Sequence, residues 1–157
     1  MKGDPKIIER LNECLTAELT AINQYFIHSR MCENWGYLRL AKKKYEESVD
    51  EMKDADRLIK RILYLDGTPN MQRLNPVRVG EDAVEQHQLD LDLEKENIER
   101  LNAAIALCRE KGDNGTRELL EEILTGEEHA ADWLESQLNV VKDIGKERYL
   151  AEMIHED

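Results

Sequence analysis

Apolar residues recur along most of the chain at intervals of three and four, the spacing of one face of an α-helix. Asp4 followed by Pro5 is typical of a helix start, because Asp caps free backbone N–H groups and Pro fits the first helical position. From there the pattern predicts a helix to about Asn34, where Trp35-Gly36 interrupts it. Further helices are predicted at about 38–65, 82–111 and 116–143, with a short fifth helix over 146–154 after Gly145. We therefore expect an all-α fold.

The connections indicate how the helices run. Trp35-Gly36 and the turn Asp113-Asn114-Gly115 are short, so each joins two helices into an antiparallel hairpin. Residues 66–81 contain two prolines and two glycines and show no helical period. A helix of about 28 residues is roughly 42 Å long, and about 15 extended residues span roughly 50 Å, so this segment can return along the whole bundle. We expect one domain over residues 1–157, a ferritin-like four-helix bundle with a long crossover between its second and third helices.

Each of the four long helices carries a glutamate in the middle of its apolar stripe. These residues are Glu18, Glu51, Glu94 and Glu127. A single one could be a partly exposed or protonated side chain, because Glu is rarely fully buried unless it is paired. Four together favour a shared site, because carboxylates crowded in an apolar interior raise one another's pKa unless cations neutralise them. Oxygen ligands suit hard or borderline cations, so the pattern predicts a metal centre.

The residues three positions after two of these glutamates are unusual for such a centre. Di-iron proteins with ferritin-like bundles combine a Glu from each of two helices with Glu-x-x-His from each of the other two. Here Asp54 follows Glu51 and Ala130 follows Glu127 at that spacing. His129 lies one residue short, turned by about 100° on a regular helix. Asp54 can still offer oxygens as a weak ligand, whereas Ala130 offers none, so we predict metal binding with weak or absent oxidation activity in this chain alone.

Charge and cysteine content exclude several classes of protein. The formal net charge is −12, and binding to a nucleic-acid backbone needs clustered Lys and Arg. No apolar run approaches the roughly 18 residues of a membrane span, and the charged N-terminus lacks the apolar stretch of a signal peptide. Cys14, Cys32 and Cys108 are odd in number without CxxC spacing, so we expect reduced packing residues. We therefore expect a cytoplasmic protein with no nucleic-acid or membrane partner.

The chain resembles the bacterioferritins over essentially its whole length. The resemblance rests on four segments: the opening Met-Lys-Gly-Asp, residues 18–26, residues 51–53 and residues 132–135. It implies a shell of twenty-four subunits that stores ferric mineral, ferroxidase activity, and an electron donor of the ferredoxin type. It also implies haem b between pairs of subunits. The four central glutamates match the family's carboxylate ligands, and the family has histidines at the positions of Asp54 and Ala130.

The family's haem iron is held by one methionine from each of two subunits, and the matching residue is Met52. Met52 lies off the Glu51 stripe, on a second one formed by Tyr45, Val49, Met52, Ala55 and Ile59. A second apolar face calls for a partner, and a twofold axis brings the same residue of both chains together. With the resemblance, we assign Met52 as the haem axial ligand and Leu19, Asn23, Phe26 and Tyr45 as its pocket. The alternative is that Met52 is ordinary interface packing.

Other charged residues remain open to two interpretations. Glu46 takes the interior-surface position that is often His in the family, and with Glu47 and Asp50 it could nucleate mineral. The same three acids could equally form an ordinary solvated face. His28, His87 and His155 have no ligand spacing, so the sequence assigns them no role.

Four hypotheses about function follow. The first is a haem-bearing storage subunit with a degraded centre, which includes the case of a shell shared with a subunit that carries both histidines. The second is a fully active ferroxidase with an all-carboxylate centre, or one rearranged by a π-bulge that turns His129 inward. The third is a structural or electron-transfer haem protein that uses the bundle without any mineral. The fourth, a DNA-protecting miniferritin, is remote, because those metal sites lie between subunits and the acids here converge within one bundle.

Overall fold

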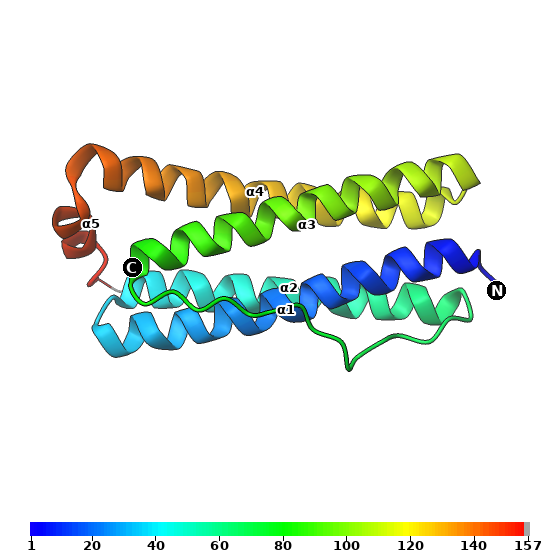
Figure 1. Ribbon diagram of the computed structural model, residues 1–157, viewed down its shortest axis with the longest axis horizontal. Coiled ribbons are helices and arrows are strands. Elements are labelled where there is room, and N and C mark those ends of the chain that lie inside the picture. Colours follow the sequence, from blue (N-terminus) through cyan, green and yellow to red (C-terminus); the bar gives the residue numbers. More distant parts are fainter. Residues whose placement is uncertain (156–157) are drawn as a thin grey trace.

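A computed structural model describes residues 1–155 as a bundle of four long helices and one short helix (Figure 1). The helices are α1 (Pro5–Trp35), α2 (Leu38–Tyr64), α3 (Ala83–Lys111), α4 (Asn114–Ile144) and α5 (Lys146–Glu152). Residues 1–155 contain no strand, which confirms the all-α prediction. Two predicted boundaries differ by two residues, since α5 ends at Glu152 and α4 begins at Asn114. Asn114 and Gly115 open α4 instead of forming a turn, because the Asp113 carboxylate accepts the backbone N–H of Thr116 at 3.0 Å and caps the helix there.

The other helix ends follow the residues that mark them in the sequence. The Asp4 side chain caps α1 by accepting the backbone N–H of Lys6 at 2.8 Å. Gly36 ends that helix with φ of 88°, a left-handed conformation that glycine adopts without a side-chain clash. The hairpin between α1 and α2 can therefore turn within two residues.

The crossover runs back along the bundle, so that α2 and α3 point in the same direction (Figure 1). It is tied to one face of α1 by backbone N–H groups that donate to side chains. Asn70 donates to Asn12 at 2.8 Å, Asn75 to Thr20 at 2.9 Å, Arg78 to Gln24 at 3.1 Å and Gly80 to His28 at 3.0 Å. The four acceptors are spaced by eight, four and four residues and thus share one helix face. The long connection is consequently held to α1 along its length.

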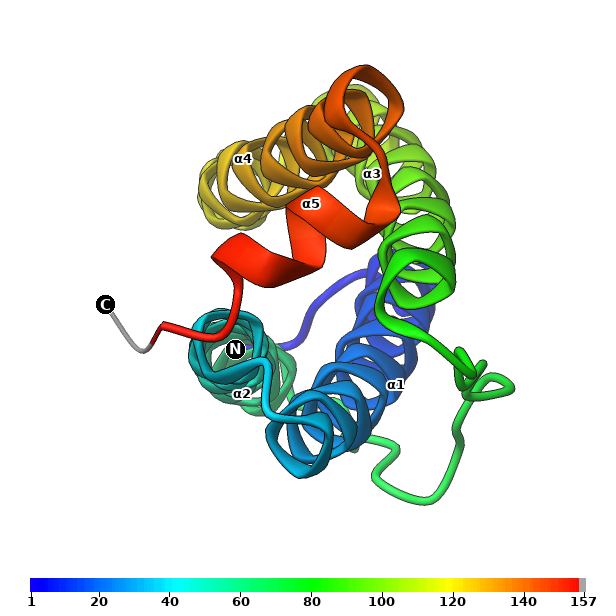
Figure 2. The same ribbon diagram turned by 90° about the vertical axis from the view of Figure 1, so that its left-hand side faces the viewer.

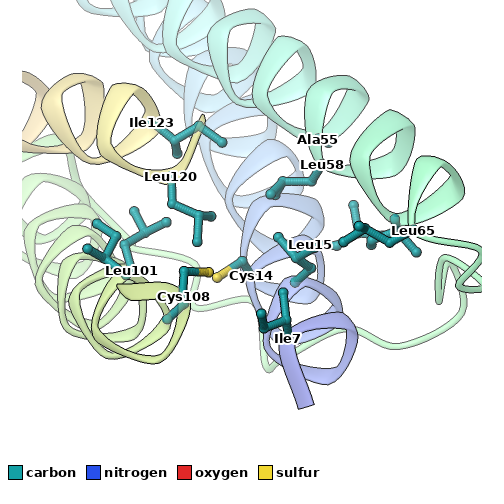
Figure 3. Packing of buried hydrophobic residues seen from close by; sticks show 14 residues of the cluster. Ile7, Cys14, Leu15, Ala55, Leu58, Leu65, Leu101, Cys108, Leu120 and Ile123 are labelled. Atoms are coloured by element: carbon teal, nitrogen blue, oxygen red, sulfur yellow. The ribbon is translucent and has the colours of Figure 1, made fainter. Parts of the chain in front are cut away.

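Apolar side chains fill both ends of the bundle. Figure 3 shows residues of all four long helices, including Leu15, Leu58 and Leu120, packed at the end where the chain begins. At the opposite end α5 crosses the bundle from α4 towards α2 (Figure 2) and buries Tyr149 beside Leu40. The backbone N–H of Arg39 donates to the carbonyl of Met153 at 3.0 Å, which fixes the segment after α5 to α2. The acidic centre lies between these two apolar ends.

No helix within residues 1–155 combines the length and apolar character that a membrane span requires. Cys14, Cys32 and Cys108 are buried free thiols. Burial raises the pKa of Cys14 to about 12 and that of Cys32 and Cys108 to about 11. The three thiols are therefore protonated packing groups, as expected from the sequence.

Candidate metal centre

The four central glutamates are enclosed by the bundle. Glu18, Glu51, Glu94 and Glu127 come from α1, α2, α3 and α4 in turn, and none is more than 2% exposed. In every one of them the Oε2 atom is buried and has no hydrogen-bond partner among residues 1–155. Leaving a buried polar atom without a partner costs about 1–3 kcal/mol, and more for a charged group. Burial, followed by the charge of Glu127, raises the pKa of Glu18, Glu51 and Glu94 well above the usual range. These oxygens fit a bound cation.

Three of the glutamates join Asp54 in a tighter group. Glu18, Glu51, Asp54 and Glu127 each offer an oxygen, and these atoms all lie within 4.8 Å of one another. Metal ions hold carboxylate oxygens at about 2.0–2.6 Å, so one cation could contact several of them. Glu94 stands outside this group, and its Oε1 accepts a hydrogen bond from the Tyr25 hydroxyl at 2.9 Å. The arrangement is an all-oxygen site with a fourth glutamate beside it.

Asp54 is the most accessible member of the group, being half-buried on α2. Burial, and then the charge of Glu127, raises its pKa to about 7. Arg57 acts in the opposite direction, with its Nη1 3.8 Å from Asp54 Oδ1. Asp54 therefore supplies an oxygen to the centre, although its carboxylate also responds to the neighbouring guanidinium.

Neither of the two α4 positions considered for an imidazole ligand, 129 and 130, supplies one to the centre. Ala130 is buried and has only a methyl group, and His129 is exposed. The helix is α-helical throughout Asn114–Ile144, without the π-bulge that would turn His129 inward. His129 instead lines a pocket of about 490 Å³ between α2 and α4, which also reaches Glu51, Asp54 and Glu127. The pocket connects the carboxylates with the protein surface.

A buried ion pair lies near the centre and was not predicted from the sequence. Lys44 Nζ donates to Asp90 Oδ2 at 2.5 Å, and both side chains are fully buried. Asp90 Oδ1 accepts from Gln24 Nε2 and from His28 Nδ1, each at 2.9 Å. His28 carries its hydrogen on Nδ1, because its Nε2 accepts the backbone N–H of Gly80. Burial alone would raise the pKa of Asp90, but Lys44 and His28 hold it at about 2.

The sequence contained a signal for this pair. Lys44 precedes Glu47 by three residues and therefore extends the inner stripe of α2, and Asp90 precedes Glu94 by four on α3. The Lys44 ammonium also lies 5.7 Å from the centroid of the Tyr25 ring, whose hydroxyl donates to Glu94. The ion pair and the metal centre are thus linked through one tyrosine.

The residues expected to hold haem lie on the outer face of α1 and α2. Met52 is 56% exposed, Phe26 46% and Tyr45 44%, while Asn23 is exposed and Leu19 half-buried. The Phe26 and Tyr45 rings are 6.4 Å apart. The Arg30 guanidinium lies 5.1 and 5.2 Å from the two ring centroids. An exposed thioether and two exposed aromatic rings on the same pair of helices fit a large, mainly apolar ligand or a partner subunit.

One member of the second stripe was placed wrongly by the sequence pattern. Ala55 is only 2% exposed and belongs to the apolar interior, because it packs against the cluster that contains Leu15 and Leu58. The outer face therefore does not include position 55, although Leu63 further along α2 is exposed again.

The three acids considered for mineral nucleation are not equivalent. Glu46 and Asp50 are exposed, whereas Glu47 is buried and pairs with Lys43 Nζ at 3.1 Å. Burial raises the pKa of Glu47. Glu47 and Asp50 line the pocket that reaches the metal centre, and Glu46 does not. His87 is buried too, with its Nε2 2.8 Å from the Tyr149 hydroxyl, and His155 is exposed.

Comparisons with known proteins agree with this architecture. A model of the ferritin-like domain matches residues 8–144. The bacterioferritins of Mycolicibacterium paratuberculosis and Mycobacterium leprae are each 49% identical to the chain over 154 residues, which cover 98% of this chain and 97% of the relative. The bacterioferritin of Streptomyces coelicolor is 48% identical over 156 residues, covering 99% and 93%.

Proposed function

Because this chain belongs to the bacterioferritins, iron-storage proteins with a ferritin-like domain, we propose that it is a storage subunit with a degraded ferroxidase centre and a haem site at Met52. The observation that carries the first part is the set of four buried Oε2 atoms without hydrogen-bond partners among residues 1–155. Iron is the cargo for which these carboxylates supply oxygen ligands. The centre binds the cation but lacks the imidazoles that suit iron during redox turnover.

Without histidine ligands, the carboxylates of the centre can still bind a cation. Glu18, Glu51, Glu127 and Asp54 bring several negative charges to one place, which favours retention of a hard cation. The pocket between α2 and α4 gives ions a path from the surface to these ligands. In this proposal iron enters through the pocket and is held by the carboxylates of the centre.

The haem proposal rests on the exposed face of α1 and α2. Met52 would give a thioether ligand from each of two subunits, and Phe26, Tyr45, Leu19 and Asn23 would line the haem pocket. Haem b would supply electron transfer to the stored mineral. The shell would contain twenty-four subunits in the cytoplasm, joined by a histidine-containing subunit that provides fast oxidation and served by a ferredoxin-type donor.

A second candidate is an active ferroxidase whose centre is all carboxylate. Asp54 favours it, because its oxygen lies with those of three glutamates within 4.8 Å. The two candidates differ in oxidation rate and not in metal binding.

Two matched pairs of variants test the sites. Glu127→Gln should weaken binding of Mn²⁺, followed by equilibrium dialysis, by at least about tenfold, since even removal of an outer partner costs that much. Glu128→Gln removes the same charge from the next, exposed residue of α4 and should leave binding unchanged. Equal binding by both variants would refute the centre.

For haem, Met52→Leu should abolish the haem absorption of the purified shell. Met71→Leu changes another exposed methionine, in the crossover, and should retain it. Full haem content in the Met52 variant would refute axial ligation by this residue.

A further inference from the structure

A second pocket, of about 470 Å³, lies at the end of the bundle that α5 covers. Its lining includes three cationic side chains from α2, Arg39, Lys42 and Lys43, and one acidic side chain, Glu46. The whole chain has a formal net charge of −12. The pocket is therefore a local cationic site on a strongly acidic protein, which favours an anionic ligand.

Two of the three cations are available to a ligand. Lys43 is half-buried and pairs with Glu47 at 3.1 Å. Arg39 and Lys42 are exposed, and neither forms an ion pair with another of the described residues. Arg offers a planar fork of N–H donors that matches a phosphate group, and Lys adds a point charge.

The floor of the pocket offers a further donor. The Tyr149 hydroxyl donates to Gln137 Oε1 at 2.6 Å, so the side-chain oxygen of Gln137 is occupied and its NH₂ group remains to donate. Tyr149 is itself buried and held by His87 Nε2 at 2.8 Å. Burial lowers the pKa of His87, which leaves this imidazole neutral. Because Tyr149 gives its hydrogen to Gln137, His87 Nε2 donates to the Tyr149 oxygen, and this chain of bonds fixes the amide.

The remaining wall is apolar and aromatic. Trp133 stands with its ring edge-on to His87 at 5.5 Å between centroids, and Lys43 Nζ lies 5.2 Å from the Trp133 ring. Leu40, Val140 and Met153 complete this wall. Pockets of about 300–1,000 Å³ with apolar walls and a few convergent polar groups are typical small-molecule sites.

We propose that this pocket binds a phosphate group through Arg39, Lys42 and the Gln137 amide, either as inorganic phosphate or as the phosphate of a mononucleotide whose base packs on Trp133. The site does not depend on the carboxylate centre. It adjoins the acidic pocket, because Lys43 lines both. Bound phosphate would thus lie on the same face as cations that pass through that pocket.

The test uses the assembled protein in phosphate-free buffer. Equilibrium dialysis with labelled inorganic phosphate and with AMP measures binding, and uncharged adenosine is the control ligand. The double variant Arg39→Gln/Lys42→Gln should weaken binding of both anions about tenfold or more, because two charge-assisted contacts are lost. Lys95→Gln/Arg109→Gln removes the same charges from exposed positions on α3 and should bind as the original protein does.

The source of the phosphate follows from comparing the two ligands. Tighter binding of AMP, lost in Trp133→Leu while phosphate binding persists, identifies a nucleotide site. Equal affinities, unaffected by Trp133→Leu, identify inorganic phosphate. Absence of saturable binding of either anion, or equal weakening in the α3 variant, overturns the proposal. Glu127→Gln should retain anion binding, so failure of the metal centre and failure of this site are distinguishable.

Discussion

At the scale of single residues, the centre combines carboxylates that repel one another in a buried space. In ferritin-like di-iron sites two imidazoles accompany the glutamates. Here Asp54 adds a carboxyl group, with a pKa raised to about 7, at one of those positions, and Ala130 adds no ligand at the other. Burial and mutual repulsion raise the pKa of Glu18, Glu51 and Glu94, so the metal-free centre disfavours the charged form of its own ligands.

Replacing one of these carboxyl groups by a neutral amide should therefore stabilise the metal-free protein. Glu51→Gln is expected to raise the unfolding temperature by roughly 2–4 °C, which is about 1 kcal/mol for a domain of this size. The exposed Glu128→Gln should change it little. Calorimetry of metal-free protein measures both, and a lower unfolding temperature for Glu51→Gln would contradict the proposed repulsion.

Stability of the metal-free protein should also depend on pH in a defined direction. A carboxyl group whose pKa is raised on folding contributes stability that is complete below its unfolded pKa and lost as the pH rises through its folded pKa. For Asp54 that window extends from its ordinary 3.8 to about 7. Asp90, with its pKa lowered to about 2, contributes above 3.8 and loses its contribution towards pH 2.

We therefore expect the unfolding temperature of metal-free protein to fall between about pH 4 and 7, and this fall to be smaller in Asp54→Asn. Thermal unfolding of both proteins at several pH values in a chelating buffer measures this change in unfolding temperature. A rise across this window that is the same in both proteins would contradict the assignment.

At the scale of helices, the sequence predicted the elements well because their start and end residues act locally. Asp4, Gly36 and the periodic apolar stripes mark α1 without reference to other helices. The contacts between elements were less predictable. The acceptors on α1 that hold the crossover, and the pairing of Lys44 with Asp90, join residues far apart in sequence, and a lone Lys or Asp on a stripe does not identify its partner.

The buried ion pair joins α1, α2 and α3, so breaking it from one side should be costly. Lys44→Met leaves Asp90 charged and buried, and we expect a loss of about 3–5 kcal/mol in unfolding free energy. The double variant Lys44→Met/Asp90→Asn should recover much of that loss, because no uncompensated charge remains. Denaturant unfolding measures the unfolding free energy of the single and double variants. A double variant as unstable as Lys44→Met would show that the pair has another role.

At the scale of the whole molecule, two faces of one bundle carry different chemistry. The outer face of α1 and α2 exposes Met52 with Phe26 and Tyr45, whereas the side between α2 and α4 opens to the carboxylates. The four-glutamate pattern and most of the outer face, except the buried Ala55, could be predicted from helical periodicity. The pocket beside Ala130 could not be predicted in this way, because it depends on how α2 and α4 pack around a small side chain.

We propose above that this chain binds iron in a centre that oxidises it slowly. The most direct measurement is oxygen consumption after ferrous iron is added to shells made of this chain alone, compared with the double variant Asp54→His/Ala130→His. We predict no rapid phase in the original protein and, in the variant, a rapid phase that saturates near about two irons per subunit, as in a di-iron centre. A rapid phase of that size in the original protein would contradict the account.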